Sequence, residues 1–216
     1  DFLMLLAPAI ILRSDFDLQK KSSLSLLYSN MATKIVNGQS AEPTLKTLLS
    51  SPDLESEYLT CVSQKTSALF AGVAEGVCII GDLNDLERKA TSEVFSEMGD
   101  LFQIQDDVLD LYGNKQRDIV GSDIKEGKVS FLIVQHLIHF PDDALRIREI
   151  LEKPRDLTTD DEVQFLIRLF KESGTLARVL ASLLKRKQTI CSQAPTSIQS
   201  FVKTLCEEIL NPLAHL

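Results

Sequence analysis

Apolar residues recur at helical spacing along nearly the whole chain, and no other feature restricts the fold as strongly. In the segment 18–36 the recurring residues are Leu24, Leu27, Met31 and Ile35. Their intervals of three and four residues place them on one side of a helix. Runs in which polar and apolar residues alternate, as they do in a half-buried strand, are absent from the sequence. We therefore expect an all-α fold.

Capping and turn residues divide the chain into separate helices. Asn37-Gly38 is expected to weaken or bend one helix, Pro43 to start a new stretch, and Gly81-Asp82 to end a long helix. The helices expected from these signals cover residues 2–12, 18–36, 54–80, 86–112, 129–140, 142–152, 160–172, 175–193 and 197–210. A polar loop is expected over 113–128. The pattern predicts a single all-α domain over residues 1–216.

The charge of the chain restricts its partners. The net charge is −8 and tryptophan is absent, whereas proteins that bind nucleic acids normally present a basic surface and stacking aromatic rings. We therefore expect no nucleic-acid partner. A phosphorylated ligand is still compatible with an acidic protein if metal ions supply the positive charge. The 44% share of hydrophobic residues is sufficient for a buried core, which argues against a disordered chain.

The cysteines and the first residues of the chain indicate in which cellular compartment the protein is expected. Four cysteines, none at a spacing typical of zinc ligands, are Cys61, Cys78, Cys191 and Cys206. We expect free thiols in a reducing compartment and hence a cytoplasmic protein. The apolar run 2–12 is too short to span a bilayer and lacks the features of a secretory signal. It is interpreted as a buried helix, and no integral membrane segment is expected.

Three aspartates lie in the middle of the helix expected over 86–112. Asp106 and Asp110 are one turn apart on the same face, and Asp107 lies at the edge of that face. Other double aspartates of this chain start helices and serve as caps, whereas these lie where no cap can form. Their position therefore indicates a function.

Crowded carboxylates on a partly buried face repel one another and lose hydration. Either their pKa values rise or a cation is bound. Ligands that offer only oxygen favour a hard ion such as Mg²⁺, which commonly bridges carboxylates to a phosphate. Asp106, Asp107 and Asp110 are therefore the candidate metal ligands.

The segment after these aspartates offers groups that suit a phosphate. Lys115 and Arg117 lie in the glycine-containing loop, and Lys128 follows Gly127 at the start of the next helix. A flexible loop with basic side chains is able to close over a diphosphate that is already bound to metal. Lys128 is the strongest candidate among the three because of its place beside a glycine at the mouth of a helix.

Several stretches resemble one enzyme family. FQIQDDVLD and GSDIKEGK resemble the second aspartate-rich motif of the trans-prenyltransferases, the polyprenyl diphosphate synthases. The residues in register with that motif are Phe102, Gln103, Asp106, Asp107, Asp110, Asp123 and Lys128. Lys65-Thr66 in QKTSALF and Gly38-Gln39 in NGQSAE resemble two further elements of the family. The resemblance covers most of the chain and weakens beyond about residue 150.

The resemblance implies the isoprenoid synthase bundle, an all-α fold with a central cavity that usually forms a homodimer. It implies an enzyme that condenses isopentenyl diphosphate with an allylic diphosphate, with Mg²⁺ assisting the departure of the diphosphate. Asp106 would be the strongest metal ligand of this motif, with Asp107 and Asp110 nearby. Lys65 and Lys128 would contact the allylic diphosphate.

The resemblance also implies roles for uncharged residues. Gln103 and Thr66 would lie near the allylic cation, and Gln39 would line the cavity. The catalytic assignments are thus Lys65, Thr66, Gln103 and Lys128, and the substrate-binding assignments are Gln39, Lys65, Gln103, Arg117 and Lys128. Many members carry Gly-Lys where this chain has Arg117-Asp118, so Arg117 or Lys115 is expected to replace that phosphate contact.

The first residues of the chain also resemble part of the family. Asp1-Phe2-Leu3 resembles the start of the helix that normally follows the first aspartate-rich motif, which these 216 residues do not contain. The N-terminal helices are therefore expected to be missing from this chain. Two alternatives remain open: a non-catalytic subunit that modulates an active synthase, and a class I terpene cyclase, which also ionises an allylic diphosphate through a DDxxD helix.

Overall fold

The computed structural model describes residues 2–113 and 120–216, and within these ranges it contains helices and no strand. The α-helices are α1 (Phe2–Arg13), α2 (Leu18–Ala41), α3 (Leu54–Val62), α4 (Ala68–Ile80), α5 (Asp85–Tyr112), α6 (Ser122–Lys125), α7 (Phe131–His139), α8 (Ala144–Leu151), α9 (Asp160–Glu172), α10 (Thr175–Gln193) and α11 (Gln199–Leu210). Short helical turns are η1 (Glu42–Leu48), the π-helical turn η2 (Ser63–Ser67), η3 (Pro141–Asp143), η4 (Arg155–Leu157) and η5 (Asn211–Leu213). The prediction of an all-α fold is confirmed.

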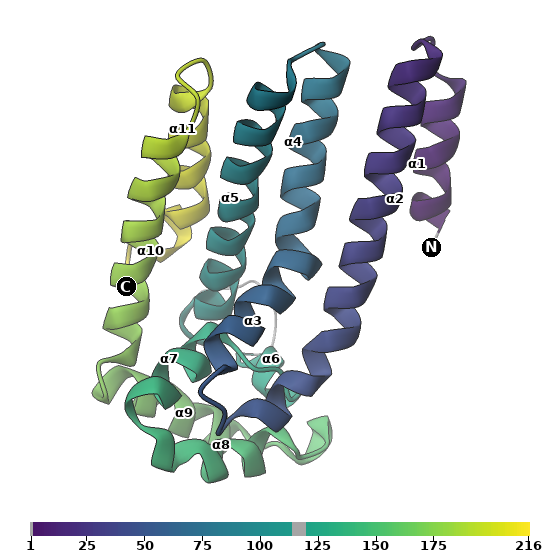
Figure 1. Ribbon diagram of the computed structural model, residues 1–216. Helices are drawn as coiled ribbons and strands as arrows, with labels where there is room; N and C mark the ends of the chain where they lie inside the picture. Colours follow the sequence, from purple (N-terminus) through teal and green to yellow (C-terminus); the bar gives the residue numbers. More distant parts are fainter. Residues whose placement is uncertain (1, 114–119) are drawn as a thin grey trace.

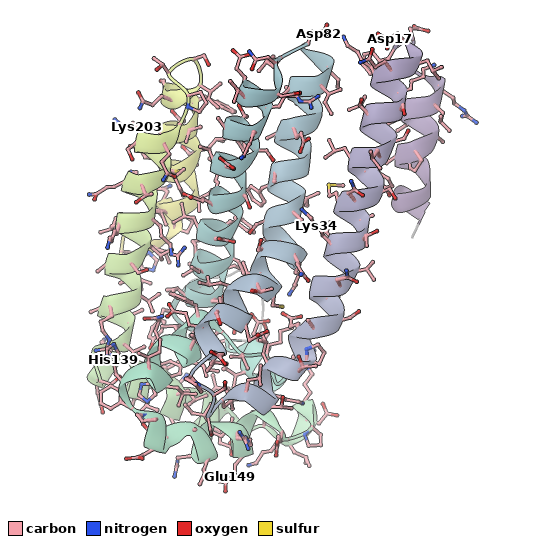
Figure 2. The ribbon with its side chains drawn as sticks, viewed as in Figure 1. Asp17, Lys34, Asp82, His139, Glu149 and Lys203 are labelled. Carbon is pink, nitrogen blue, oxygen red and sulfur yellow. The ribbon has the colours of Figure 1, made fainter. Side chains whose placement is uncertain are left out.

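The long helices lie side by side, and the short helices gather at one end of the bundle (Figure 1). α4 packs against α2 and α5, α5 against α10, and α10 against α11. His139 and Glu149 mark the end that holds the short helices, whereas Asp17 and Asp82 lie at the opposite end (Figure 2). The π-helical turn η2 lies between α3 and α4, and it contacts both α2 and α5.

Local sequence and burial together define α5, the helix that carries the three aspartates. Asn84 starts it with a capping box: the Asn84 side chain accepts a hydrogen bond from the Glu87 N–H, and the Glu87 carboxylate accepts one from the Asn84 N–H. The apolar side of the helix is fully buried at Leu101, Ile104 and Val108. Burial of this side fixes the rotation of α5 and so determines which way its polar residues point.

The helix predicted over 18–36, which Asn37-Gly38 was expected to weaken or bend, extends further than predicted. α2 continues through this pair to Ala41, and the N–H of Glu42 still donates to the Gly38 carbonyl. Gly38 is buried against the backbone of η2, where a side chain would not fit. The glycine therefore permits a close approach of two backbones rather than ending a helix.

Two further elements were not expected from the sequence. The helix predicted over 54–80 is divided by η2, in which the Ala68 N–H donates to the Ser63 carbonyl five residues earlier. The loop predicted over 113–128 contains the short helix α6 between Gly121 and Gly127, both of which have positive φ. Helical spacing alone does not report either feature, because a single π turn and a four-residue helix are too short to show a periodicity of their own.

The expectation of a buried first helix is not met over residues 6–13, the part of α1 whose side chains the structure describes. α1 forms, but Ile10 and Leu12 expose 60% and 63% of their surface, and none of residues 6–13 is buried. α1 packs against α2, which leaves these apolar side chains open to solvent. Along the described ranges, no helix combines the length and the apolar character needed to cross a bilayer.

The cysteines agree with the expectation of free thiols. All four are unpaired, and three of them are buried: Cys61, Cys78 and Cys206. Burial is the main cause that raises the pKa of the Cys61 thiol to about 11, so this thiol stays protonated.

Candidate active site

A cavity of about 140 Å³ opens where η1, α3, η2 and α5 meet the segment between α6 and α7. Its polar lining consists of Glu42, Tyr58, Lys65, Gln103, Asp106, Asp107, Asp123, Lys128 and Ser130, with Cys61. These residues come from segments up to 88 positions apart, from 42 to 130, so only the tertiary structure brings them together. A cavity lined by acids and by two lysines suits an anion that arrives with a cation.

α5 presents three of the predicted residues to this cavity: Gln103, Asp106 and Asp107. Gln103 and Asp106 are partly exposed, whereas Asp107 exposes 4% of its surface. The arrangement follows from the burial of the opposite, apolar side of α5. Asp106 is thus the aspartate of the motif that lines the cavity and is also partly exposed to solvent.

Asp107 is held by three hydrogen bonds. Its Oδ2 accepts from the Tyr58 hydroxyl at 2.6 Å and from the Phe131 N–H at 2.6 Å, and its Oδ1 accepts from the Gln103 amide nitrogen at 3.0 Å. Burial raises the pKa of Asp107 to about 7, although these three hydrogen bonds act in the opposite direction. Asp107 therefore serves first as a buried anchor that joins α3, α5 and α7.

The hydrogen bond to Asp107 fixes the orientation of the Gln103 amide. Because the nitrogen of this amide donates to a carboxylate, its oxygen faces the other way and accepts from the Thr66 hydroxyl at 2.8 Å. Thr66 itself is not part of the cavity lining. The structure thus brings the predicted pair Thr66 and Gln103 into direct contact, with a defined direction of hydrogen bonding.

The two predicted lysines approach the cavity from different elements. Lys65 lies in η2, and its Nζ is 2.6 Å from Oε1 of Glu42. Lys128 precedes α7, and its Nζ is 3.0 Å from Asp123 Oδ1 and 2.8 Å from Glu126 Oε2.

Burial alone would lower the pKa of Lys128, but the hydrogen bonds and charges of Glu126 and Asp123 outweigh it and raise the pKa above its usual range. Lys128 is therefore charged at neutral pH.

Asp110 occupies a different environment from the other two aspartates. Its Oδ1 accepts from the Ser122 hydroxyl at 2.7 Å, and its Oδ2 accepts from the Asp123 N–H at 3.1 Å. It is buried and is not part of the cavity lining. These contacts tie the start of α6 to α5 and thereby locate Asp123, which does line the cavity.

Three of the predicted site residues remain, namely Gln39, Lys115 and Arg117. Gln39 is exposed and lies outside the cavity lining; its amide nitrogen donates to Oε2 of Glu42 at 3.3 Å, and the other oxygen of Glu42 holds Lys65. Lys115 and Arg117 lie outside the described residues.

Sequence reasoning missed two residues that organise the site, Tyr58 and Glu42. Tyr58 is buried to 3% exposure in α3, and a buried tyrosine normally needs a partner for its hydroxyl. Its position two helical turns before Lys65 was a usable signal, because that spacing places both residues on one side of a helix. No comparable signal exists for Glu42, whose role depends on the turn η1.

The donor set of the cavity fits a hard divalent cation. Asp106, Asp107 and Asp123 contribute carboxylate oxygens, and no histidine lines the cavity. In the part of the chain that the structure describes, no group of three or more acidic, histidine or cysteine side chains is arranged as a complete metal site. Mg²⁺ is usually held by one or two carboxylates and completes its shell with water and phosphate oxygens.

Comparisons with known proteins point in the same direction. The family model described as polyprenyl synthetase matches residues 1–170. The short chain isoprenyl diphosphate synthase of Methanocaldococcus jannaschii is 32% identical over 165 residues, which cover 75% of this chain and 49% of that protein. The farnesyl pyrophosphate synthase of Rattus norvegicus is 31% identical over 121 residues, which cover 55% of this chain and 33% of that protein. The chain thus spans about half or less of the length of these relatives.

Solved structures share the fold. A geranylgeranyl pyrophosphate synthase superposes with a TM-score of 0.83 at 21% identity and covers 98% of this chain and 66% of that one. The geranylgeranyl pyrophosphate synthase of Corynebacterium glutamicum, crystallised with isoprenyl diphosphate and magnesium, gives a TM-score of 0.81 at 18% identity, covering 97% of this chain and 60% of that one. The likeness confirms the predicted isoprenoid synthase bundle. With a family model matched over most of its length, the chain belongs to the polyprenyl synthetase family.

Proposed function

We propose that this chain forms the diphosphate-binding wall of a prenyl diphosphate synthase, which condenses isopentenyl diphosphate with an allylic diphosphate. The observation that carries the proposal is the convergence of Asp106, Lys65 and Lys128 on one cavity. Relatives named as isoprenyl, farnesyl and geranylgeranyl diphosphate synthases support this choice of substrate class.

Lys65 and Lys128 bind the oxygens of the allylic diphosphate in this proposal. Each ammonium is held by a carboxylate in the structure, Lys65 by Glu42 and Lys128 by Asp123. These ion pairs keep both lysines ordered before the substrate arrives, which reduces the conformational entropy lost on binding. Both lysines have further donor hydrogens for a phosphate oxygen, because an ammonium group carries three.

Gln103 orients the reacting end of the substrate. Its amide oxygen is the negative end of a dipole and is directed by the hydrogen bond that its nitrogen gives to Asp107. A dipole that is fixed before the reaction stabilises positive charge without the cost of turning toward it. Thr66 completes the arrangement by donating to the same amide oxygen.

Asp106 is the residue that would hold Mg²⁺, and Asp107 and Asp123 line the same cavity. When bound, Mg²⁺ neutralises the charge that develops on the departing diphosphate. Asp110 contributes indirectly, because it holds α6 and therefore Asp123 in place. Assembly as a homodimer and a cytoplasmic location are part of the same proposal, and analytical ultracentrifugation and cell fractionation test them.

The substitution Asp106→Ala tests the metal role. We expect it to lower the incorporation of labelled isopentenyl diphosphate into a longer prenyl chain by more than about 100-fold, since even residues that only support metal ligands cost 10–100-fold. The helical content measured by circular dichroism should stay unchanged, because Asp106 is partly exposed and lies in the interior of α5, away from both of its ends. Asp142→Ala is the matched control: Asp142 is an exposed aspartate in η3, outside the cavity.

Two results would contradict the proposal. Equal turnover of the Asp106→Ala and Asp142→Ala variants would remove the metal role assigned to Asp106. A cyclic hydrocarbon product without chain elongation would show a cyclase instead of a synthase.

A further inference from the structure

The π-helical turn η2, which carries Lys65 and Thr66, lies against a glycine of α2. A Cβ atom placed on Gly38 would lie 2.5 Å from the backbone nitrogen of Lys65 and 2.9 Å from its Cα. Gly38 is buried, and its carbonyl accepts a hydrogen bond from the Cys61 thiol at 3.3 Å. The backbones of α2 and η2 are therefore so close at Gly38 that no side chain fits between them.

A second glycine, on α5, contacts the same turn. A Cβ atom placed on Gly99 would lie 2.5 Å from the Cα of Ser67 and 2.9 Å from its Oγ. The Ser67 hydroxyl donates to the carboxylate of Asp100, the residue next to Gly99, so the turn is bound to α5 at this point. η2 is thus clamped between two helices at Lys65 and Ser67, the residues on either side of Thr66.

Other glycines of the helices show that this contact is not a general property of the fold. In α4, a Cβ atom on Gly76 would lie 3.7 and 3.8 Å from leucine methyl groups, which is an ordinary contact. On Gly72 it would meet the sulfur of Met31 at 2.6 Å, the flexible end of a side chain that can move. At Gly38 and Gly99 the obstacle is backbone, which cannot turn aside.

We propose that Gly38 and Gly99 are positioning residues, which hold η2 so that Lys65 and Thr66 reach their partners at the cavity. Neither glycine is itself part of the cavity lining. A π turn is rare and occurs mostly as a single turn within a longer helical segment, so its shape depends on what packs around it. The catalytic consequence rests on the proposed function, but the positioning of the two side chains does not.

The size of the effect follows from the distances. To restore an ordinary contact of 3.4 Å, a methyl group at Gly38 has to move the backbone of Lys65 by about 0.9 Å, the difference between 3.4 and 2.5 Å. A misplacement of about 1 Å in a binding or catalytic group costs up to about 100-fold. We therefore expect Gly38→Ala and Gly99→Ala each to weaken the binding of magnesium pyrophosphate by about 10- to 100-fold.

The experiment compares these two variants with Gly76→Ala, the glycine whose added methyl group fits. Isothermal titration with Mg²⁺ and inorganic pyrophosphate gives the dissociation constant, and two-dimensional NMR gives the amide shifts of residues 63–68. Gly38→Ala and Gly99→Ala should weaken binding and move these amide shifts, while Gly76→Ala stays within about twofold of the wild type.

A double-variant cycle distinguishes positioning from a general structural role. If Gly38 acts through Lys65, the variant Gly38→Ala with Lys65→Ala binds no more weakly than Lys65→Ala alone. Losses that simply add would overturn the proposal. So would folded Gly38→Ala and Gly99→Ala variants that bind pyrophosphate and show amide shifts like Gly76→Ala.

Failure of the proposed function gives a different result. If the wild-type chain does not bind magnesium pyrophosphate at all, the diphosphate site is wrong, and the amide shifts still decide whether the glycines position Lys65 and Thr66. If a glycine variant does not fold, the nuclear Overhauser effect between the Gly38 Hα and the Lys65 amide proton of the wild type decides. Its presence supports the close contact, and its absence overturns the proposal.

Discussion

Replacing Tyr58 by phenylalanine isolates one hydrogen bond at the centre of the site. The hydroxyl of Tyr58 donates to Oδ2 of Asp107 at 2.6 Å, and the ring packs against Phe131 with centroids 5.5 Å apart. The substitution removes the hydroxyl and keeps the ring. Asp107 retains the hydrogen bonds from the Phe131 N–H and from Gln103, so the change is confined to one donor.

The expected loss depends on the charge of Asp107. A hydrogen bond to an ionised group contributes about 2 kcal/mol and one to a neutral group about 1 kcal/mol. Because the pKa of Asp107 is raised to about 7, the carboxyl group is protonated near pH 5.5 and ionised near pH 8.5. Tyr58→Phe should therefore lower the free energy of unfolding by about 1 kcal/mol at the lower pH and by about 2 kcal/mol at the higher pH.

The sign of this pH dependence follows from linkage. In the wild type, the folded state binds the Asp107 proton more tightly than the unfolded chain, so this group lowers the free energy of unfolding as the pH rises from about 4 to about 7. Loss of a donor to the ionised form raises the pKa further, by about 0.7 units for a difference of 1 kcal/mol. Tyr58 does not titrate in this range, because burial and the charge of Asp107 raise its pKa well above the usual value.

Urea unfolding followed by circular dichroism at both pH values measures the effect. Tyr112→Phe is the matched control, because the hydroxyl of Tyr112 donates to the neutral carbonyl of Ile167 at 2.7 Å. This control should lose about 1 kcal/mol at both pH values. Any difference between tyrosine and phenylalanine in the unfolded chain is the same at both pH values and cancels. A loss for Tyr58→Phe that does not depend on pH would refute the reasoning about Asp107.

Five further substitutions, two of which are matched controls, test other parts of the structure. Gly121→Ala should cost about 2–4 kcal/mol, because Gly121 has a φ of 72° and a Cβ atom there would lie 2.4 Å from a valine methyl group of α9. Gly174→Ala, with a φ of 74° but its nearest neighbour 3.5 Å away, should cost only about 1 kcal/mol; equal losses in urea unfolding would contradict this. Leu166→Ala should cost about 2–5 kcal/mol because Leu166 is fully buried, whereas Leu145→Ala, at 70% exposure, should stay within about 0.5 kcal/mol by the same measurement. Asp110→Ala should speed hydrogen exchange at the amides of α6, and unchanged exchange would show that Asp110 does not hold this helix.

The positions of most helices could be predicted from local signals. The spacing of apolar residues and the caps at Asn84 and Thr159 define α5 and α9 without reference to the rest of the chain. The burial of α1 could not be predicted, because apolar residues form an amphipathic or hydrophobic helix whether or not another element covers them. Gly38 was misread for a related reason: a glycine that ends a helix and a glycine that permits close packing look the same in sequence.

The types of residue at the site could be predicted from the sequence, but the different environment of each aspartate could not. The spacing of the DDxxD motif placed three carboxylates near one side of a helix. In the structure, Asp106 lines the cavity, the buried Asp107 accepts a hydrogen bond from the Tyr58 hydroxyl, and Asp110 accepts one from the Ser122 hydroxyl. Helical geometry fixes the angle between these side chains, but each local environment comes from a different neighbouring segment.

The sequence by itself therefore determined an all-α chain in which one long helix carries three aspartates near one side, with lysines before and after that helix in the chain. Helical periodicity and residue chemistry are local properties, which is why the sequence is sufficient for them. Only the tertiary structure decided that Lys65 sits in a π turn between two glycines, and that Asp106 and Asp107 line the cavity while Asp110 does not. The physical reason is that Glu42, the partner of Lys65, lies 23 positions away in the chain, and that two of the three partners of Asp107, Phe131 and Tyr58, lie 24 and 49 positions away. Contacts over such separations are decided by the packing of whole helices and not by the residues that flank them.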